Sequence, residues 1–162
     1  MKKYLYAAIV LLALPNAQAA SEIKVGSWEI TLNTDEWGSP RQIAYAHSGK
    51  TDLRVRCDSD GLQVYLTDDR FFDDFRFGMT EAEVRWQITP KMKSISKQQD
   101  WELASSYTGI FVPDTTIPGF IQALKTGRSF RIMINGVRGV KEYKIANISG
   151  FDKAVRYLKC VK

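Results

Sequence analysis

The feature that most constrains this chain is a stretch in which apolar and polar residues alternate with a period of two. Residues 53–57 alternate Leu, Val and Cys with two arginines, an Asp-Ser-Asp-Gly turn follows, and residues 62–66 alternate again. Successive side chains of a strand point to opposite faces, and a turn rich in Asp and Gly joins antiparallel strands. The pattern predicts a β-hairpin whose core face carries Leu53, Val55 and Cys57.

Similar alternation recurs along the chain and is typical of strands in an antiparallel sheet. It covers residues 28–32, 84–88, 130–134 and 143–145. Two segments have helical spacing instead: residues 117–124, with Pro118 near the start and Gly127 just past the end, and the apolar stripe from Phe151 to Leu158. We therefore predict a mainly β fold with two short helices, in which the C-terminal helix packs on an antiparallel sheet or sandwich.

The predicted C-terminal helix has signals at both ends. Ser149 precedes Asp152 by three residues, which is the spacing of a capping box. Cys160 lies nine positions after Phe151, about 180° around an unbroken helix, so there it would point away from the core face. We expect the helix to end at residues 158–159, where a turn would bring the cysteine back to the sheet.

The N-terminal segment has the three regions of a secretory signal peptide. Two lysines precede an apolar run over residues 4–14, and the small-residue sequence Ala17-Gln18-Ala19 follows. The run is shorter than the about 20 apolar residues that span a bilayer, so we predict a cleavable signal at residues 1–19 and no stable membrane anchor. Residues 20–162 then form a single β-rich domain in the periplasm of a bacterium.

Cys57 and Cys160 are the two cysteines of the chain. In an oxidising compartment, two cysteines most simply form one intramolecular disulfide. The bond would close a loop of about 100 residues and tie the C-terminal helix to the sheet. Pairing between two chains and two free thiols are the alternatives.

The residue pattern predicts no catalytic and no metal site. His47 is the single histidine, and a lone histidine in a turn-like stretch is more typical of a surface residue than of a catalytic base. Zinc would lack ligands as well. A disulfide would also leave no thiolate nucleophile. The sequence has no glycine-rich phosphate loop and no recognised nucleic-acid motif. We therefore expect a non-enzymatic protein with no cofactor and no nucleic acid among its partners.

The most unusual local feature is the run Asp68-Asp69-Arg70-Phe71-Phe72-Asp73-Asp74-Phe75, in which two acidic pairs flank two aromatic residues. Its spacing differs from that of a calcium loop. One interpretation is a solvated turn whose phenylalanines feed the core. A second is a partner-binding loop with the candidate contacts Phe71, Phe72, Asp73 and Asp74. A third is a catalytic or metal site built from convergent carboxylates.

Charge is distributed unevenly along the predicted mature chain. Residues 20–90 carry 8 basic and 13 acidic side chains, whereas residues 91–162 carry 13 and 5. Five basic residues lie on or between two consecutive predicted strands: Arg128, Arg131, Arg138, Lys141 and Lys144. If they share a face, Arg131 and Lys144 stand opposite each other, and a cationic stripe with Lys141 faces an anionic partner. A plain solvated face is the alternative.

Several of these features occur in a recognisable order. They are Trp28, Leu53-Arg54-Val55-Arg56-Cys57, Val84-Arg85-Trp86-Gln87-Ile88, Trp101, the predicted helix 117–125, and Gly150-Phe151-x-x-Ala154-Val155-x-x-Leu158-x-Cys160. Together they resemble the small periplasmic proteins associated with type VI secretion, the VasI-like family, and more loosely the invasion-associated locus B group. Residues 68–77 depart from that pattern. The resemblance implies a β-rich exported fold and an accessory role in secretion without catalysis.

These observations predict a non-enzymatic periplasmic interaction protein, an accessory of a type VI-like secretion system that binds a protein partner in the cell envelope. The candidate contact surfaces are the basic strand pair and the acidic and aromatic loop. The alternative is a periplasmic inhibitor or immunity protein against a toxin or cell-wall hydrolase, because a preorganised domain loses little entropy on binding.

Overall fold

The structure, a computed structural model, describes residues 21–34, 38–73, 75, 78–90 and 95–161. The predicted signal peptide, residues 1–19, lies outside them. The strands are β1 (Ser21–Val25), β2 (Trp28–Thr34), β3 (Pro40–Ser48), β4 (Thr51–Asp58), β5 (Gly61–Thr67), β6 (Glu81–Pro90), β7 (Ile95–Leu103), β8 (Gly109–Phe111), β9 (Gly127–Gly136) and β10 (Gly139–Ile145). The α-helices are α1 (Ile117–Thr126) and α2 (Phe151–Ala154), and the 3-10 helices are η1 (Asp69–Asp73) and η2 (Val155–Tyr157).

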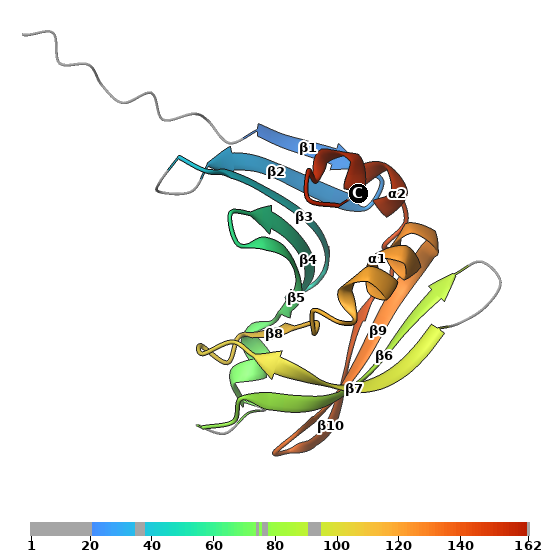
Figure 1. The fold of residues 1–162 in the computed structure, drawn as a ribbon. Coiled ribbons are helices and arrows are strands. Elements are labelled where there is room, and N and C mark those ends of the chain that lie inside the picture. The colour runs from blue at the N-terminus through green and yellow to red at the C-terminus, as the bar shows by residue number, and fades with distance from the viewer. Residues whose placement is uncertain (1–20, 35–37, 74, 76–77, 91–94, 162) are drawn as a thin grey trace, which may run out of the picture.

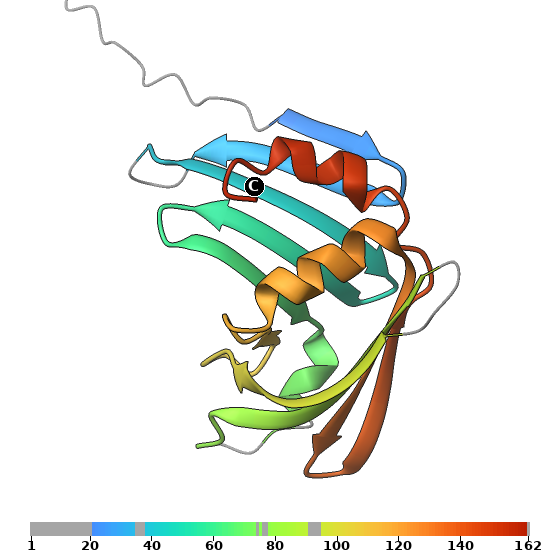
Figure 2. The ribbon, with the colours of Figure 1, turned by 45° about the vertical axis from the view of Figure 1, so that its right-hand side comes forward.

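The strands described form one antiparallel sheet in the order β1-β2-β3-β4-β5-β8-β7-β6-β9-β10. The short strand β8 pairs with β5 on one side and with β7 on the other, so it joins two groups of strands. Figures 1 and 2 show the sheet bent into two arms, with α1 between them on the concave side and α2 against β1 and β2. The predicted mainly β fold with two short helices is confirmed, and its strands form a single curved sheet.

Strands β4 and β5 are the predicted hairpin. The pair Asp58 and Gly61 closes a two-residue turn. Gly61 has a φ of +103°, in the left-handed region that glycine adopts without a steric penalty. On the core face, β4 buries three apolar side chains, as predicted: Leu53, Val55 and Cys57.

Helix α1 fills the space between the two arms with an aromatic core. The ring of Phe120 lies 4.8 to 5.9 Å, centroid to centroid, from the rings of Trp86, Phe130 and Trp101. A polar link fixes the start of the helix, because the Gln99 amide donates to Thr116 Oγ1 at 2.7 Å and accepts from Trp86 Nε1 at 3.0 Å. These contacts place the first turn of α1 against β6 and β7.

The C-terminal helix differs from the prediction at its start. Helix α2 follows Gly150, which has left-handed backbone dihedrals and makes no side-chain cap. The predicted capping box at Ser149 is therefore wrong, and the Ser149 carbonyl oxygen instead accepts from the Ser27 backbone N–H at 3.2 Å. Together α2 and η2 end at Tyr157, just before the predicted residues 158–159.

The segment around α2 is bound to the N-terminal hairpin and to β4. The predicted intramolecular disulfide is confirmed, since Cys57 and Cys160 are bonded with their Cα atoms 5.7 Å apart. The fully buried indole of Trp28 donates from Nε1 to the Ile148 carbonyl oxygen at 2.8 Å. Its ring also lies 4.6 Å from that of Phe151. The end of the described chain therefore covers its first two strands.

Candidate functional site

The acidic run begins with a buried ionic link. Asp68 is 2% exposed, and its carboxylate accepts hydrogen bonds from Thr51 Oγ1 at 2.5 Å and from Arg70 Nε at 2.8 Å. The Arg70 guanidinium lies over the ring of Tyr143 on β10, 5.1 Å from its centroid. Asp68 and Arg70 therefore connect the β4 arm with the β10 arm.

The pKa of Asp68 reflects two opposing effects. Burial would raise the pKa, but hydrogen bonds from Arg70 and Thr51 hold it below its ordinary value of 3.8. A carboxyl whose pKa is lower in the folded state stabilises the fold fully above the unfolded pKa, and this contribution is lost as the pH falls through the folded pKa. Asp68 therefore makes the fold acid-sensitive.

The Asp68→Asn variant is expected to lose about 1–3 kcal/mol of unfolding free energy at pH 7, because charge-assisted hydrogen bonds to a buried group are lost. Its unfolding free energy should also depend less on pH below about pH 4 than that of the wild type. Urea unfolding between pH 7 and pH 3 measures both effects. Asp69→Asn is the matched control, since Asp69 is adjacent and exposed. Equal stability of the two variants would contradict the assignment.

Phe71 is placed in the core and not at a contact surface. Its side chain is fully buried, and its ring lies 4.7 Å from that of Tyr143 and 6.1 Å from that of Phe75. The prediction of Phe71 as a binding residue is therefore wrong, because the rings of Phe71 and Phe75 are both buried in the core. The side chains of Phe72 and Asp73, and the whole of Asp74, lie outside the described residues.

The basic strand pair forms an ion-pair network around Glu142. Arg131 and Lys144 are opposite residues of β9 and β10, as predicted. Both contact Glu142, at 3.3 Å from Arg131 Nη1 and 3.0 Å from Lys144 Nζ. The hydrogen bond from Lys144 lowers the pKa of Glu142 most, with a further contribution from Arg131. Arg131 also donates to the Gln87 side chain. One carboxylate between two cations leaves only part of the expected positive charge.

Lys141 does not join this network. It pairs across the sheet with Ile134, whose side chain is buried on the core side. Positions 141 and 144 are three residues apart, so their side chains leave a strand on opposite faces. The prediction that Lys141 shares a stripe with Arg131 and Lys144 is therefore wrong.

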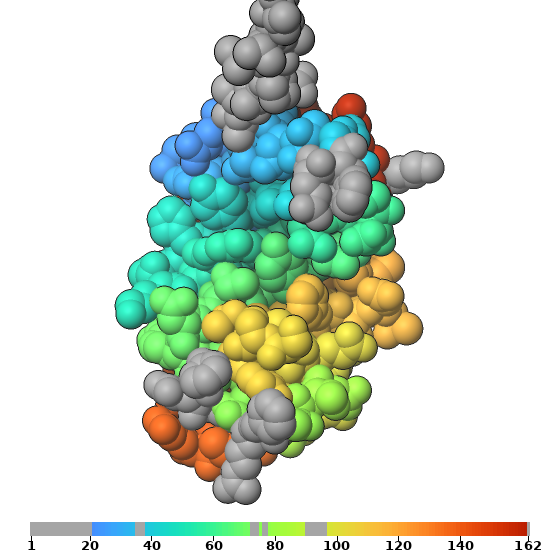
Figure 3. Space-filling view, turned by 90° about the vertical axis from the view of Figure 1, so that its left-hand side faces the viewer, coloured from blue at the N-terminus to red at the C-terminus, as the bar shows by residue number. Residues whose placement is uncertain are grey.

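A larger side-chain assembly lies on the solvent face of the β1–β5 arm. Figure 3 shows this face, where the strands from β1 to β5 and then β8 and β7 follow one another as bands. One residue from each of six strands stands opposite the next, and we call this set the outer row: Glu29, Tyr45, Arg54, Tyr65, Phe111 and Glu102. The row consists of three charged and three aromatic side chains, with Tyr65 and Phe111 as neighbours.

The outer row is held in place by its own contacts. The Tyr65 and Phe111 rings lie 5.2 Å apart, and only 9% of Tyr65 is exposed. Arg54 Nη2 contacts Asp52 Oδ2 at 2.6 Å. Hydrogen bonding to Glu29, together with burial, raises the pKa of Tyr45 far above its ordinary value of 10.0. The Tyr45 hydroxyl also donates to Glu22 Oε1 at 3.2 Å. The row therefore presents a preorganised surface of aromatic rings and a guanidinium.

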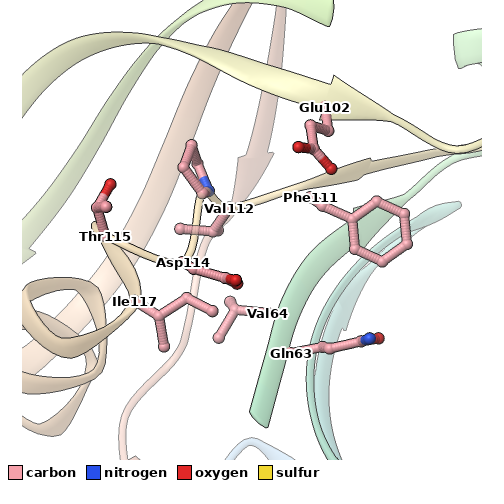
Figure 4. Close-up of a pocket in the computed structure, with 9 residues that line it drawn as sticks. Gln63, Val64, Glu102, Phe111, Val112, Asp114, Thr115 and Ile117 are labelled. Carbon is pink, nitrogen blue, oxygen red and sulfur yellow. The ribbon is translucent and has the colours of Figure 1, made fainter. Parts of the chain in front are cut away.

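A groove opens at the β8 end of this face, where the chain leaves β8 and starts α1. Its first hollow, of about 380 Å³, is lined by residues of β5, β7, β8 and the loop before α1. Figure 4 shows Glu102 on β7 extending its carboxylate toward the side where Asp114 and Gln63 lie. A second hollow, of about 410 Å³, continues past Ile117 along α1 to Val161. We call the two hollows together the α1 groove.

The sequence patterns did not predict the outer row or the α1 groove. Arg54 and Tyr65 were recognisable as outward-facing residues, because they alternate with buried neighbours. Their assembly with Phe111 depends on β8 lying beside β5, which is a contact between strands that are not consecutive in the chain.

The described residues contain no group of three or more histidine, cysteine, aspartate or glutamate residues placed to hold a metal ion. Over the same ranges, no helix combines the length and apolar character needed to cross a bilayer. Comparison with protein-family models, with curated proteins and with solved structures finds no match to this chain.

Proposed function

We propose that this chain is a non-enzymatic binding protein of the periplasm, an accessory of a type VI-like secretion system that contacts a protein partner in the cell envelope. The outer row is the observation that carries the proposal. Tyrosine and arginine are the residue types most enriched among those that dominate binding energy at protein interfaces. Here they are already ordered before any partner arrives, which lowers the entropy cost of binding.

We place the centre of the partner interface at the middle of the outer row. Tyr45 and Arg54 are directly opposite each other, and both are half-buried by their neighbours. Truncating both to alanine removes an aromatic ring and a guanidinium without touching the core. Charged residues at the ends of the row, such as Glu29, would then form the polar rim that surrounds an interface centre.

The Tyr45→Ala and Arg54→Ala double variant is expected to weaken partner binding at least about 30-fold, the effect of losing an interface hot spot of about 2 kcal/mol. A pull-down from periplasm with the wild-type protein as bait identifies the partner. Titration of the purified partner into the wild-type protein and each variant then measures the affinity. Arg131→Ala is the matched control, because Arg131 is exposed on the other arm.

Two results would contradict this proposal. Recovery of no envelope or secretion component by the wild-type protein would remove the interaction role. Equal affinity of the double variant and the Arg131→Ala control would remove the outer row as the contact surface. The secretion role has its own readout, since a deletion strain should recover secretion with the wild-type gene and not with the double variant.

A further inference from the structure

The α1 groove has an open strand edge along one side. β8 ends at Phe111, and pairing with β5 ends one bond later, where the Val112 N–H donates to the Val64 carbonyl oxygen at 2.8 Å. Between that bond and its first residue, Gly61, β5 has no partner among the described strands on the side where β8 lies. Alternate residues of a strand direct their backbone groups to the same side, so the N–H and C=O of Leu62 face the groove. They can pair with an added extended segment.

The two ends of the groove differ in chemistry. At the first hollow, Glu102 and Asp114 are exposed, and neither has an ion-pair partner among the described residues. Gln63 also lines this hollow, and its side-chain oxygen accepts from Arg56 Nη2 at 2.7 Å. The second hollow is mainly apolar, and its lining includes Leu62, Ile117, Ile121 and Val161. The groove is therefore complementary to a cation next to an apolar side chain.

We propose that the α1 groove binds an extended segment of a partner protein, added as a strand along the open edge of β5. A lysine or arginine of that segment lies between Glu102 and Asp114, and an apolar side chain packs against Ile117 and Val161. This inference rests on the proposed function, because it names the chemistry of the partner. The groove adjoins the outer row, since Phe111 and Glu102 belong to both.

Nuclear magnetic resonance titration of the nitrogen-15-labelled protein tests the inference with three synthetic probes. The first is a seven-residue peptide with one lysine between two valines and one leucine two positions later. The second has glutamate in place of the lysine. The third is the lysine peptide N-methylated at alternate backbone nitrogens, which removes the donors of one strand edge. We expect the lysine peptide to shift the amide signals of Leu62, Asp114 and Val161, and the other two to bind at least about tenfold more weakly.

A charge reversal in the groove gives the sharper result. The double variant Glu102→Lys with Asp114→Lys should prefer the glutamate peptide over the lysine peptide by at least about tenfold. Glu83→Lys with Asp152→Lys is the matched control, because it makes the same change in net charge at exposed positions outside the groove. The control should keep the preference for lysine.

The inference is overturned if the lysine and glutamate peptides bind equally, if neither binds at millimolar concentration, or if the shifted signals map to another strand edge such as β1. None of these results contradicts the proposed function as long as the outer-row double variant still binds the natural partner more weakly than the wild-type protein does. If the outer-row double variant binds the natural partner as tightly as the wild-type protein, but the groove still prefers the lysine peptide, the outer row is not the contact surface and the groove is still a peptide site.

Discussion

Replacement of both cysteines, Cys57→Ser with Cys160→Ser, is expected to lower the free energy of unfolding by about 4–5 kcal/mol. The two residues are 103 positions apart, so the bond removes many conformations from the unfolded chain. The native contacts around the bond persist without it, including the hydrogen bond from the Lys159 N–H to Gln42 Oε1 at 3.0 Å. We therefore expect the variant to fold with a lower denaturation midpoint in guanidinium chloride.

Reductant provides the control for the disulfide. It should destabilise the wild-type protein by a similar amount and leave the double serine variant unchanged, because that variant has no bond to reduce. The result that would contradict the expectation is a variant with the same midpoint as the oxidised wild type. The bond would then be without effect on the equilibrium between the folded and unfolded chain.

Gly26→Ala is expected to cost about 2–5 kcal/mol of unfolding free energy, since two penalties add at this position. Gly26 has a φ of +63°, and a Cβ atom there would lie 2.6 Å from the Ser149 backbone oxygen. The left-handed backbone alone costs about 1–2 kcal/mol with a side chain. The overlap with a backbone atom adds about 1–3 kcal/mol, because the turn between β1 and β2 and the segment before α2 must separate.

Gly49→Ala carries only the first penalty, the left-handed backbone. Gly49 has the same φ of +63°, but a Cβ atom there has nothing within 4 Å. This variant should lose only about 1–2 kcal/mol. Thermal and denaturant unfolding of the two variants side by side measure the difference. Equal losses would mean that the contact between Gly26 and Ser149 adds nothing to stability.

Local patterns predicted most of the secondary structure. The β4–β5 hairpin and α1 follow from the spacing of their own residues, so the alternation at 53–57 and the helical spacing at 117–124 were sufficient. The position of β8 was not predictable in this way. Gly109–Phe111 is three residues long, too short for a periodic signal, yet it joins the two arms of the sheet. Its place depends on pairing with β5 and β7.

The candidate site was harder to predict for the same reason. The outer row requires the order of six strands, which no single segment contains. The error at Phe71 arose because an acidic and aromatic turn has the same composition whether its rings point inward or outward. The error at Lys141 was avoidable, because a spacing of three from Lys144 places the two side chains on opposite faces of a strand.

The contact between the β1–β2 hairpin and the C-terminal segment determines when folding is complete. The bonds that Ser27 and Trp28 make with Ser149 and Ile148 span 122 and 120 positions. Bringing such distant segments together costs loop-closure entropy before any contact compensates it, which makes this docking a late event in folding. Until the last helix arrives, the indole of Trp28 remains in water. Strands β1 and β2 precede the other described strands in the chain, yet their core face is buried last.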